Sequence, residues 1–222
     1  MATADLFAPG IRPYTDREEV LHALTHGAAV PVAALGTVLL LIRAEGGAQV
    51  ASAAIYGASM IAVFLASTLY HATWRTARQG LFRTLDHAAI YLKIAGTYTP
   101  MAIIALPPGT GTALLAVVWL LAAAGISVKL ARHGQMPCIL GERLSLACYL
   151  AMAWVGIVAI FPIFAALGPA TFGWLMAGAA CFTVGAAIYA QHRLHYSHVA
   201  WHVFVLAGST CHFVMVWRVM GA

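Results

Sequence analysis

Long apolar stretches separated by short polar segments make up most of this sequence. Five stretches are free of Asp, Glu, Lys and Arg: 20–42, 46–74, 94–128, 144–192 and 194–217. A helix needs about 20 apolar residues to cross a bilayer, so the two longest stretches must each be divided. Pro107-Pro108-Gly109 supplies a turn in one of them, and Pro162 with Gly168-Pro169 supplies turns in the other.

This pattern predicts an all-α integral membrane protein, a bundle of seven transmembrane helices. We expect residues 1–19 to form a cytoplasmic N-terminal segment and residues 20–222 to form one transmembrane domain. The composition agrees, because 62% of the residues are hydrophobic and 9% are charged, which is outside the range of a soluble domain. The predicted helices lie near 20–42, 49–73, 84–106, 112–131, 141–162, 170–191 and 196–218.

The basic residues predict the orientation. Placing the N-terminus in the cytoplasm leaves only Arg43 and Arg218 on the outer side. The positive-inside rule therefore predicts a cytoplasmic N-terminus and an extracytoplasmic C-terminus, in the inner (plasma) membrane of the cell. The net charge of +5 is explained by loops that touch anionic lipid, and nucleic-acid binding is not expected. The inner segments would hold Arg12, Arg17, Arg75, Arg78, Arg83, Lys129, Arg132, Arg143 and Arg193.

Polar residues recur near one end of the apolar segments. Ser67 and His71 are four residues apart, as are His198 and His202, so each pair shares a helix face. The predicted helix 49–73 ends at the cytoplasmic side, where the helices that carry Asp86 and His198 begin, so all these residues share one depth. Two His four residues apart plus a third from another helix can supply three nitrogen ligands to Zn²⁺ and leave a fourth position for water.

Other interpretations of the same residues stay open. A His at the end of a transmembrane helix often hydrogen-bonds only to lipid headgroups or backbone, although ionisable residues within spans are costly and usually functional. Asp86 could pair with Lys93, seven residues on and on nearly the same helix face. His26 could support the ligands from behind, and His212 could contact substrate or serve packing with a single hydrogen bond.

Five motifs follow one another along the chain: Thr25-His26-Gly27, Ser67-Thr-Leu-Tyr-His71, Leu85-Asp86-His87-Ala-Ala-Ile-Tyr91, Ile94-Ala-Gly-Thr-Tyr-Thr-Pro100 and His198-Val-Ala-Trp-His202. Together they closely resemble the hemolysin III family, the bacterial branch of the progestin and adiponectin receptor family. The resemblance implies a seven-helix membrane protein with zinc near the cytoplasmic face. It implies that His71, His198 and His202 are the zinc ligands. Asp86 would hold the water at the zinc, and Ser67 would lie just behind it.

The chemistry expected of such a site is hydrolysis. Three neutral imidazoles leave Zn²⁺ its positive charge, which activates water and polarises a carbonyl oxygen, and Asp86 could act as general base. The resemblance of the wider family to alkaline ceramidases implies a membrane lipid with an acyl amide or ester bond as substrate. The alternative is a non-enzymatic lipid-sensing regulator with a structural zinc, whose fourth ligand would be Asp86 or His26. A pore-forming toxin is disfavoured, because a secreted toxin needs a water-stable form.

Overall fold

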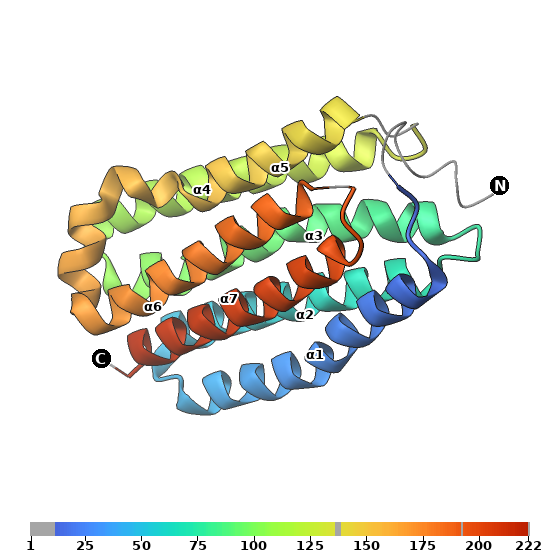
Figure 1. Cartoon of the computed structure of the whole chain (residues 1–222). Coiled ribbons are helices and arrows are strands. Elements are labelled where there is room, and N and C mark those ends of the chain that lie inside the picture. The colour runs from blue at the N-terminus through green and yellow to red at the C-terminus, as the bar shows by residue number, and fades with distance from the viewer. Residues whose placement is uncertain (1–11, 136–138, 192, 222) are drawn as a thin grey trace.

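The computed structural model describes residues 12–135, 139–191 and 193–221, so residues 1–11 of the predicted N-terminal segment lie outside the described residues. Every regular element within these ranges is helical, as predicted, and the long helices lie side by side in a bundle (Figure 1). A short π-helix, η2, extends α3, and a short 3-10 helix, η3, precedes α6. The elements are α1 (Asp16–Arg43), α2 (Gly46–Ala72), α3 (Gln79–Pro100), η2 (Met101–Ala105), α4 (Pro108–Ala131), α5 (Ile139–Ala153), η3 (Val155–Ala159), α6 (Ile160–Tyr189) and α7 (Ser197–Val219).

Six helical runs in the described ranges are long and apolar enough to cross a membrane: Asp16–Arg43, Gly46–Ala72, Gln79–Ala105, Pro108–Ala131, Gly141–Tyr189 and Ser197–Val219. Large apolar side chains also cover the outside of the bundle, where Val158 and Phe161 are each 84% exposed. Contiguous apolar surface of this kind suits a hydrocarbon surrounding and would be unfavourable in water. The chain is therefore a multi-pass protein of the plasma membrane.

The region predicted to hold two helices, 141–162 and 170–191, differs in detail from the prediction. It forms one apolar helical run of 49 residues, Gly141–Tyr189. Pro162 does not end a helix, because it lies in the first turn of α6, where a backbone N–H is not required. The α-helix α5 ends at Ala153, and the helical path is broken again at Gly168 (φ 67°, ψ 167°), one of the predicted turn residues. Figure 1 shows α5 and the second half of α6 running in opposite directions.

The beginning of α1 is fixed by a capping box and tied to the beginning of α7. The Thr15 hydroxyl accepts a hydrogen bond from the backbone N–H of Glu18, whose carboxylate accepts one from the backbone N–H of Thr15. The same carboxylate pairs with Arg12 and accepts a hydrogen bond of 2.9 Å from the backbone N–H of Tyr196, just before α7. Helices far apart in the sequence therefore start at the same end of the bundle.

Glycines allow close helix packing, as Gly96 and Gly111 illustrate. A Cβ atom on Gly96 of α3 would lie 2.1 Å from the Ser59 hydroxyl of α2. A Cβ atom on Gly111 of α4 would lie 2.2 Å from the backbone oxygen of Ala102 in η2. Small residues allow membrane helices to approach this closely, because lipid supplies no hydrophobic force to hold them together.

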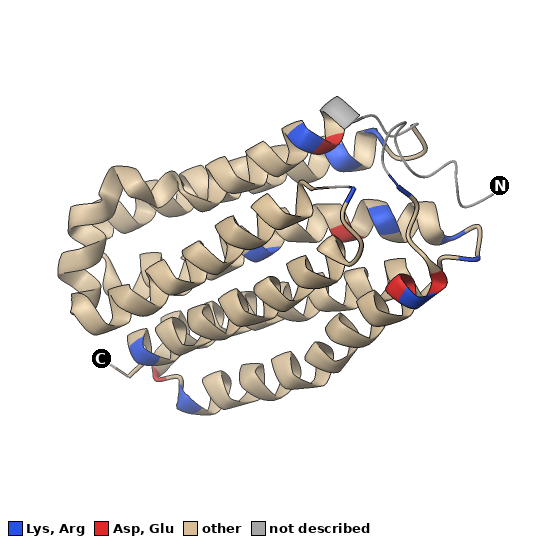
Figure 2. Cartoon of the chain, viewed as in Figure 1, with Lys and Arg blue, Asp and Glu red and all other residues tan. Residues whose placement is uncertain are grey.

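Charged residues gather at one end of the bundle. Figure 2 shows most Lys, Arg, Asp and Glu at the end where α1, α3 and α7 begin, and few at the opposite end. Arg43, at the end of α1, and Arg218, in the last turn of α7, belong to the sparsely charged end. The unequal distribution that the sequence predicted is thus present in the fold.

Candidate metal centre

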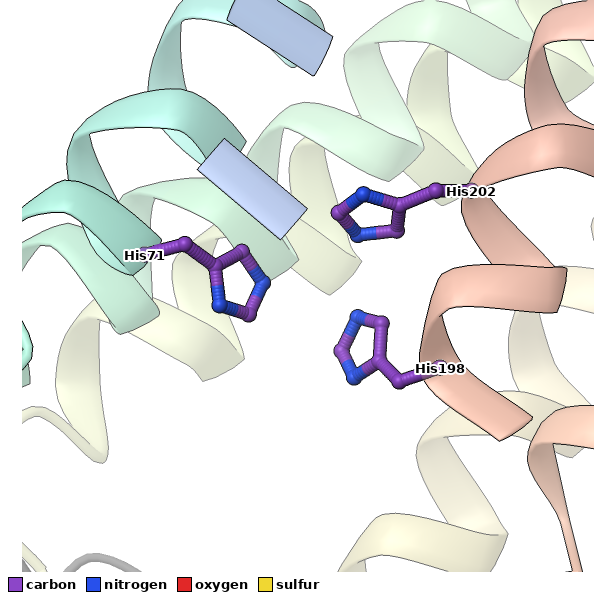
Figure 3. Close-up of side chains that lie close together, drawn as sticks. All are labelled: His71, His198 and His202. Atoms are coloured by element: carbon purple, nitrogen blue, oxygen red, sulfur yellow. The ribbon is translucent and has the colours of Figure 1, made fainter. Parts of the chain in front are cut away.

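Three histidines meet inside the charged end of the bundle. His71 comes from the last turn of α2, and His198 and His202 come from the first turns of α7. All three are buried, and their rings point toward one another from two facing helices (Figure 3). Each offers one nitrogen, and these nitrogens all lie within 4.8 Å of one another. The structure thus brings together the three residues that the sequence predicted as ligands, which we call the three-imidazole cluster.

Each ring of the cluster is oriented by a group on α1 or just before it. The Nδ1–H of His71 donates to the Glu19 carboxylate over 2.6 Å. His202 Nδ1 lies 3.0 Å from the Thr25 hydroxyl, which itself lies 2.8 Å from the backbone oxygen of Leu21. A hydroxyl that donates to that backbone oxygen accepts from the imidazole, so Nδ1 of His202 carries the proton.

His198 is also hydrogen-bonded at Nδ1. Its Nδ1 is 2.5 Å from the hydroxyl of Tyr14, whose ring also packs edge-on against His198 with centroids 5.0 Å apart. Desolvation raises the pKa of Tyr14 well above its usual value, so this phenol stays neutral. A hydrogen bond at Nδ1 fixes the ring and leaves Nε2 for another partner.

The remaining ring nitrogens are suited to a cation. His71 Nε2 is buried without a hydrogen-bond partner among the described residues, and a buried polar atom in that condition costs about 1–3 kcal/mol. A neutral imidazole whose Nδ1 is protonated presents a lone pair at Nε2, the form in which His binds divalent metals. The residues therefore fit a metal ion held by His71, His198 and His202, with an outer layer of Glu19, Tyr14 and Thr25.

A fourth histidine, His22, lies against this cluster and was not singled out from the sequence. It is completely buried, and its ring centroid is 4.4 Å from that of His71 and 4.5 Å from that of His198. Glu19, His22 and His71 form a second group whose ligand atoms lie within 4.8 Å of one another. The spacing Glu19-x-x-His22-x-x-x-His26 places all three on one helix face and was a signal that could have identified them.

The structure puts the predicted catalytic residues next to the cluster but outside both groups of potential ligands. Asp86 is buried beside the Ser67 hydroxyl, and neither belongs to the two sets of potential ligands among the described residues. His26 Nδ1 is 2.8 Å from Ser67 Oγ, and its ring stacks on that of His202 with centroids 3.6 Å apart. His26 therefore supports both Ser67 and a cluster member, the role that the sequence left open.

These residues stand at the head of an internal cavity. It has a volume of about 130 Å³ and is lined by Asp86, Ser67 and His198 at the cluster and by Met101 and Met215 at its far end. The suggested pairing of Asp86 with Lys93 is wrong, since no such ion pair is present among the described side chains. Lys93 instead lies deeper in the cavity, with Nζ 4.2 Å from the ring centre of Phe182.

Comparisons with known proteins cover almost the whole bundle. The family model described as Haemolysin-III related matches residues 14–213. The chain is 37% identical over 203 residues to Hemolysin-3 of Bacillus cereus, covering 90% of each protein. It is 37% identical over 206 residues to the Hemolysin-3 homolog of Bacillus subtilis (strain 168), covering 91% of this chain and 94% of that one. Monocyte to macrophage differentiation factor of Homo sapiens is 22% identical over 207 residues, covering 90% and 84%.

Proposed function

The chain belongs to the hemolysin III family, and we propose that it is a zinc-dependent membrane hydrolase of lipid acyl amide or ester bonds. One observation carries the proposal: three buried imidazoles, each hydrogen-bonded at Nδ1, converge beside a carboxylate at the head of an apolar cavity. Imidazole donors suit Zn²⁺, although iron, copper and nickel also bind them.

His71, His198 and His202 would hold the ion, with Glu19, Tyr14 and Thr25 keeping their rings in place. Zn²⁺ in such a site supplies a Lewis acid that activates water near neutral pH and polarises a carbonyl oxygen. A set of three protein nitrogens is typical of catalytic zinc sites, because structural sites are usually closed by a fourth protein ligand.

Asp86 is the general base of the proposed reaction. It is buried, lines the cavity beside the cluster and is not one of the grouped ligands, so its carboxylate is available to take a proton from the attacking water. It then passes that proton to the leaving amine or alcohol as the acyl bond breaks. Ser67, held by His26, is positioned to hydrogen-bond the Asp86 carboxylate or the substrate.

The substrate class follows from the cavity. Its walls are mainly apolar residues of α3, α5, α6 and α7, including Ile94, Leu150 and Val205. An acyl chain packs favourably against apolar walls, whereas a polar metabolite would lose its hydration without gaining hydrogen bonds in return. The bilayer supplies lipids with these chains directly to a protein embedded in it.

We assign seven crossings to the chain, with the cluster at the cytoplasmic side. The turn near Gly168 and the opposite directions of α5 and the second half of α6 support two crossings within Gly141–Tyr189. The basic residues at the cluster end support a cytoplasmic location for it. Cysteines introduced at Glu45 and Ala166 should react with a membrane-impermeant thiol reagent from one side of the membrane, and cysteines introduced at Arg132 and Arg193 should react from the other side. Labelling of Ala166→Cys from the same side as Arg132→Cys and Arg193→Cys would contradict the two crossings.

A second function is supported by His22. Its ring contacts those of His71 and His198, and both its nitrogens are buried without hydrogen-bond partners among the described residues. If His22 supplied a fourth nitrogen, the metal site would be closed, and the protein would act as a lipid-sensing regulator with a structural zinc.

Metal analysis combined with hydrolysis assays tests the proposal. Protein purified in detergent without chelator should contain about one zinc per chain, and His71→Ala, His198→Ala and His202→Ala should each lose it while remaining folded. Asp86→Asn should keep the zinc but lose at least about 100-fold in the rate of acyl amide or ester hydrolysis. Absence of metal from the wild type would refute the zinc site. Zinc without turnover across acyl amides and esters of varied chain length would favour the regulator.

A further inference from the structure

Lys93 is a basic residue inside the cavity and away from the three-imidazole cluster. It lies on α3, seven residues beyond Asp86, which corresponds to about 10 Å of helical rise. The side chain is buried, and its Nζ faces the ring of Phe182. No acidic side chain pairs with it in the part of the chain that the structure describes. A buried amino group without an acidic partner within a membrane span is costly, which usually marks a functional role.

His212 of α7 lies against the same aromatic ring. The centroids of His212 and Phe182 are 5.4 Å apart, and both residues line the cavity together with Lys93. Gly178 of α6 makes room for the imidazole, because a Cβ atom there would lie 2.2 Å from its Cδ2. Three helices therefore bring Lys93 and His212 to one part of the cavity.

The hydrogen bonds of His212 determine which partner its ring can take. Its Nε2 lies 3.2 Å from the backbone oxygen of Leu175, which can only accept, so Nε2 carries the proton. Nδ1 is then an acceptor in the neutral ring, and it is buried without a partner among the described residues. Lys93 supplies a donor, and His212 supplies an acceptor. A hydroxyl group satisfies both at once, because it accepts one hydrogen bond and donates another.

The cavity is long and mainly apolar, which limits the molecule that could carry this hydroxyl. Its lining on α7 extends from His198 to Met215, about 25 Å by helical rise. This length and these walls suit a hydrocarbon chain, whereas a molecule that is polar along its length would lose its hydration there.

We propose that Lys93 and His212 form a subsite for a hydroxyl group partway along the acyl chain of the lipid that the cavity binds. The inference rests on the proposed function in one respect, that an acyl chain enters the cavity from the cluster end. With the carbonyl group at the cluster, the hydroxyl lies about 10–15 Å along the chain, as the rise from Asp86 to Lys93 and from His202 to His212 requires. The subsite makes the protein selective for mid-chain hydroxylated acyl groups over plain ones.

Ricinoleate and oleate test this inference, because they differ by one mid-chain hydroxyl. Binding of each to wild-type protein in phosphatidylcholine nanodiscs gives a ratio of dissociation constants. We expect ricinoleate to bind about tenfold more tightly than oleate, because one hydrogen-bonded group in a buried site contributes about this factor to affinity. Lys93→Met and His212→Phe should each bring the ratio close to one, mainly by weakening ricinoleate binding, and circular dichroism of each variant establishes that the helices are retained. Lys129→Met is the matched control, since Lys129 bonds Ser145 and does not line the cavity.

The result that overturns the inference is equally specific. A wild-type ratio below about two, or a tenfold ratio that persists in both Lys93→Met and His212→Phe, excludes the subsite. His71→Ala separates this question from the metal site: it should weaken both ligands equally or not at all and keep their ratio. Loss of the preference in His71→Ala, with retention in Lys93→Met, would mean that the hydroxyl is recognised at the cluster instead. If the zinc and hydrolysis tests failed, the ratio of the two dissociation constants would still test the hydroxyl subsite.

Discussion

Glu19 should control the metal affinity of the three-imidazole cluster by hydrogen-bonding one of its imidazoles. Its carboxylate accepts a hydrogen bond of 2.6 Å from His71 Nδ1, and both side chains are almost completely buried. A carboxylate in this position fixes the ring and makes the opposite nitrogen a better donor, and removing such a partner costs roughly 10–100-fold in metal affinity. This range corresponds to about 1.4–2.7 kcal/mol.

Two substitutions of Glu19 should give the lower and the upper end of this loss in metal affinity. Glu19→Gln keeps an amide oxygen that can accept from Nδ1–H, so only the charge is lost and we expect about a tenfold weakening. Glu19→Ala removes the acceptor and leaves a buried N–H unpaired, so we expect about 100-fold. Zinc affinity is measured by competition with a chromophoric chelator, after circular dichroism has established that the helices are retained. Glu45→Gln is the control, because Glu45 is exposed at the opposite end of the bundle.

Two results would refute this reasoning about Glu19. Wild-type affinity in Glu19→Ala would mean that the contact with His71 does not tune the ligand. Loss of a second equivalent of zinc, with the first retained, would mean that Glu19 binds metal directly in the group it forms with His22 and His71. The stoichiometry and the affinity therefore have to be measured on the same samples.

The remaining predictions concern the support of the cluster and the packing of the bundle. Tyr14→Phe removes the hydroxyl that is hydrogen-bonded to His198 Nδ1. Because that hydroxyl is uncharged, zinc affinity in the same competition assay should fall by about tenfold or less. A loss larger than that of Glu19→Ala would contradict the expectation that the charged partner contributes more. Gly111→Ala forces a methyl group against the backbone oxygen of Ala102, so it should destabilise the folded protein by about 1–3 kcal/mol in reversible unfolding from detergent micelles. Gly109→Ala, which meets nothing within 4 Å, is its control, and equal stability of the two variants would show that the close approach does not restrain the fold.

The pattern of the sequence was sufficient for the main architectural result. Apolar stretches in a chain with few charges require helices when the solvent is hydrocarbon, since every backbone group must be satisfied within the segment. The uneven distribution of Arg and Lys was visible in the same way. The path within Gly141–Tyr189 was harder to predict, because Pro162 is compatible with a first helical turn while Gly168 is where the helical path breaks.

The three histidines of the cluster could be selected from sequence because spacing and depth are one-dimensional properties. The i, i+4 relation puts His198 and His202 on one face, and helix direction brings His71 to the same end. The residues that contact and orient these three histidines could not be identified in this way. Glu19, Tyr14 and His22 precede or begin α1, and their proximity to α2 and α7 depends on how three helices pack.

The amino-acid sequence by itself determined that this is an all-helical membrane protein, which of its ends is more charged, and which residues share the depth of a candidate metal site. These properties depend on local periodicity and on the cost of charge in lipid. Only the tertiary structure decided that groups on α1 and just before it orient all three imidazoles, that His22 joins them, and that Lys93 and His212 both face Phe182. Neighbours across helices are set by rotation and close packing around small residues such as Gly178, which no pattern along one helix records.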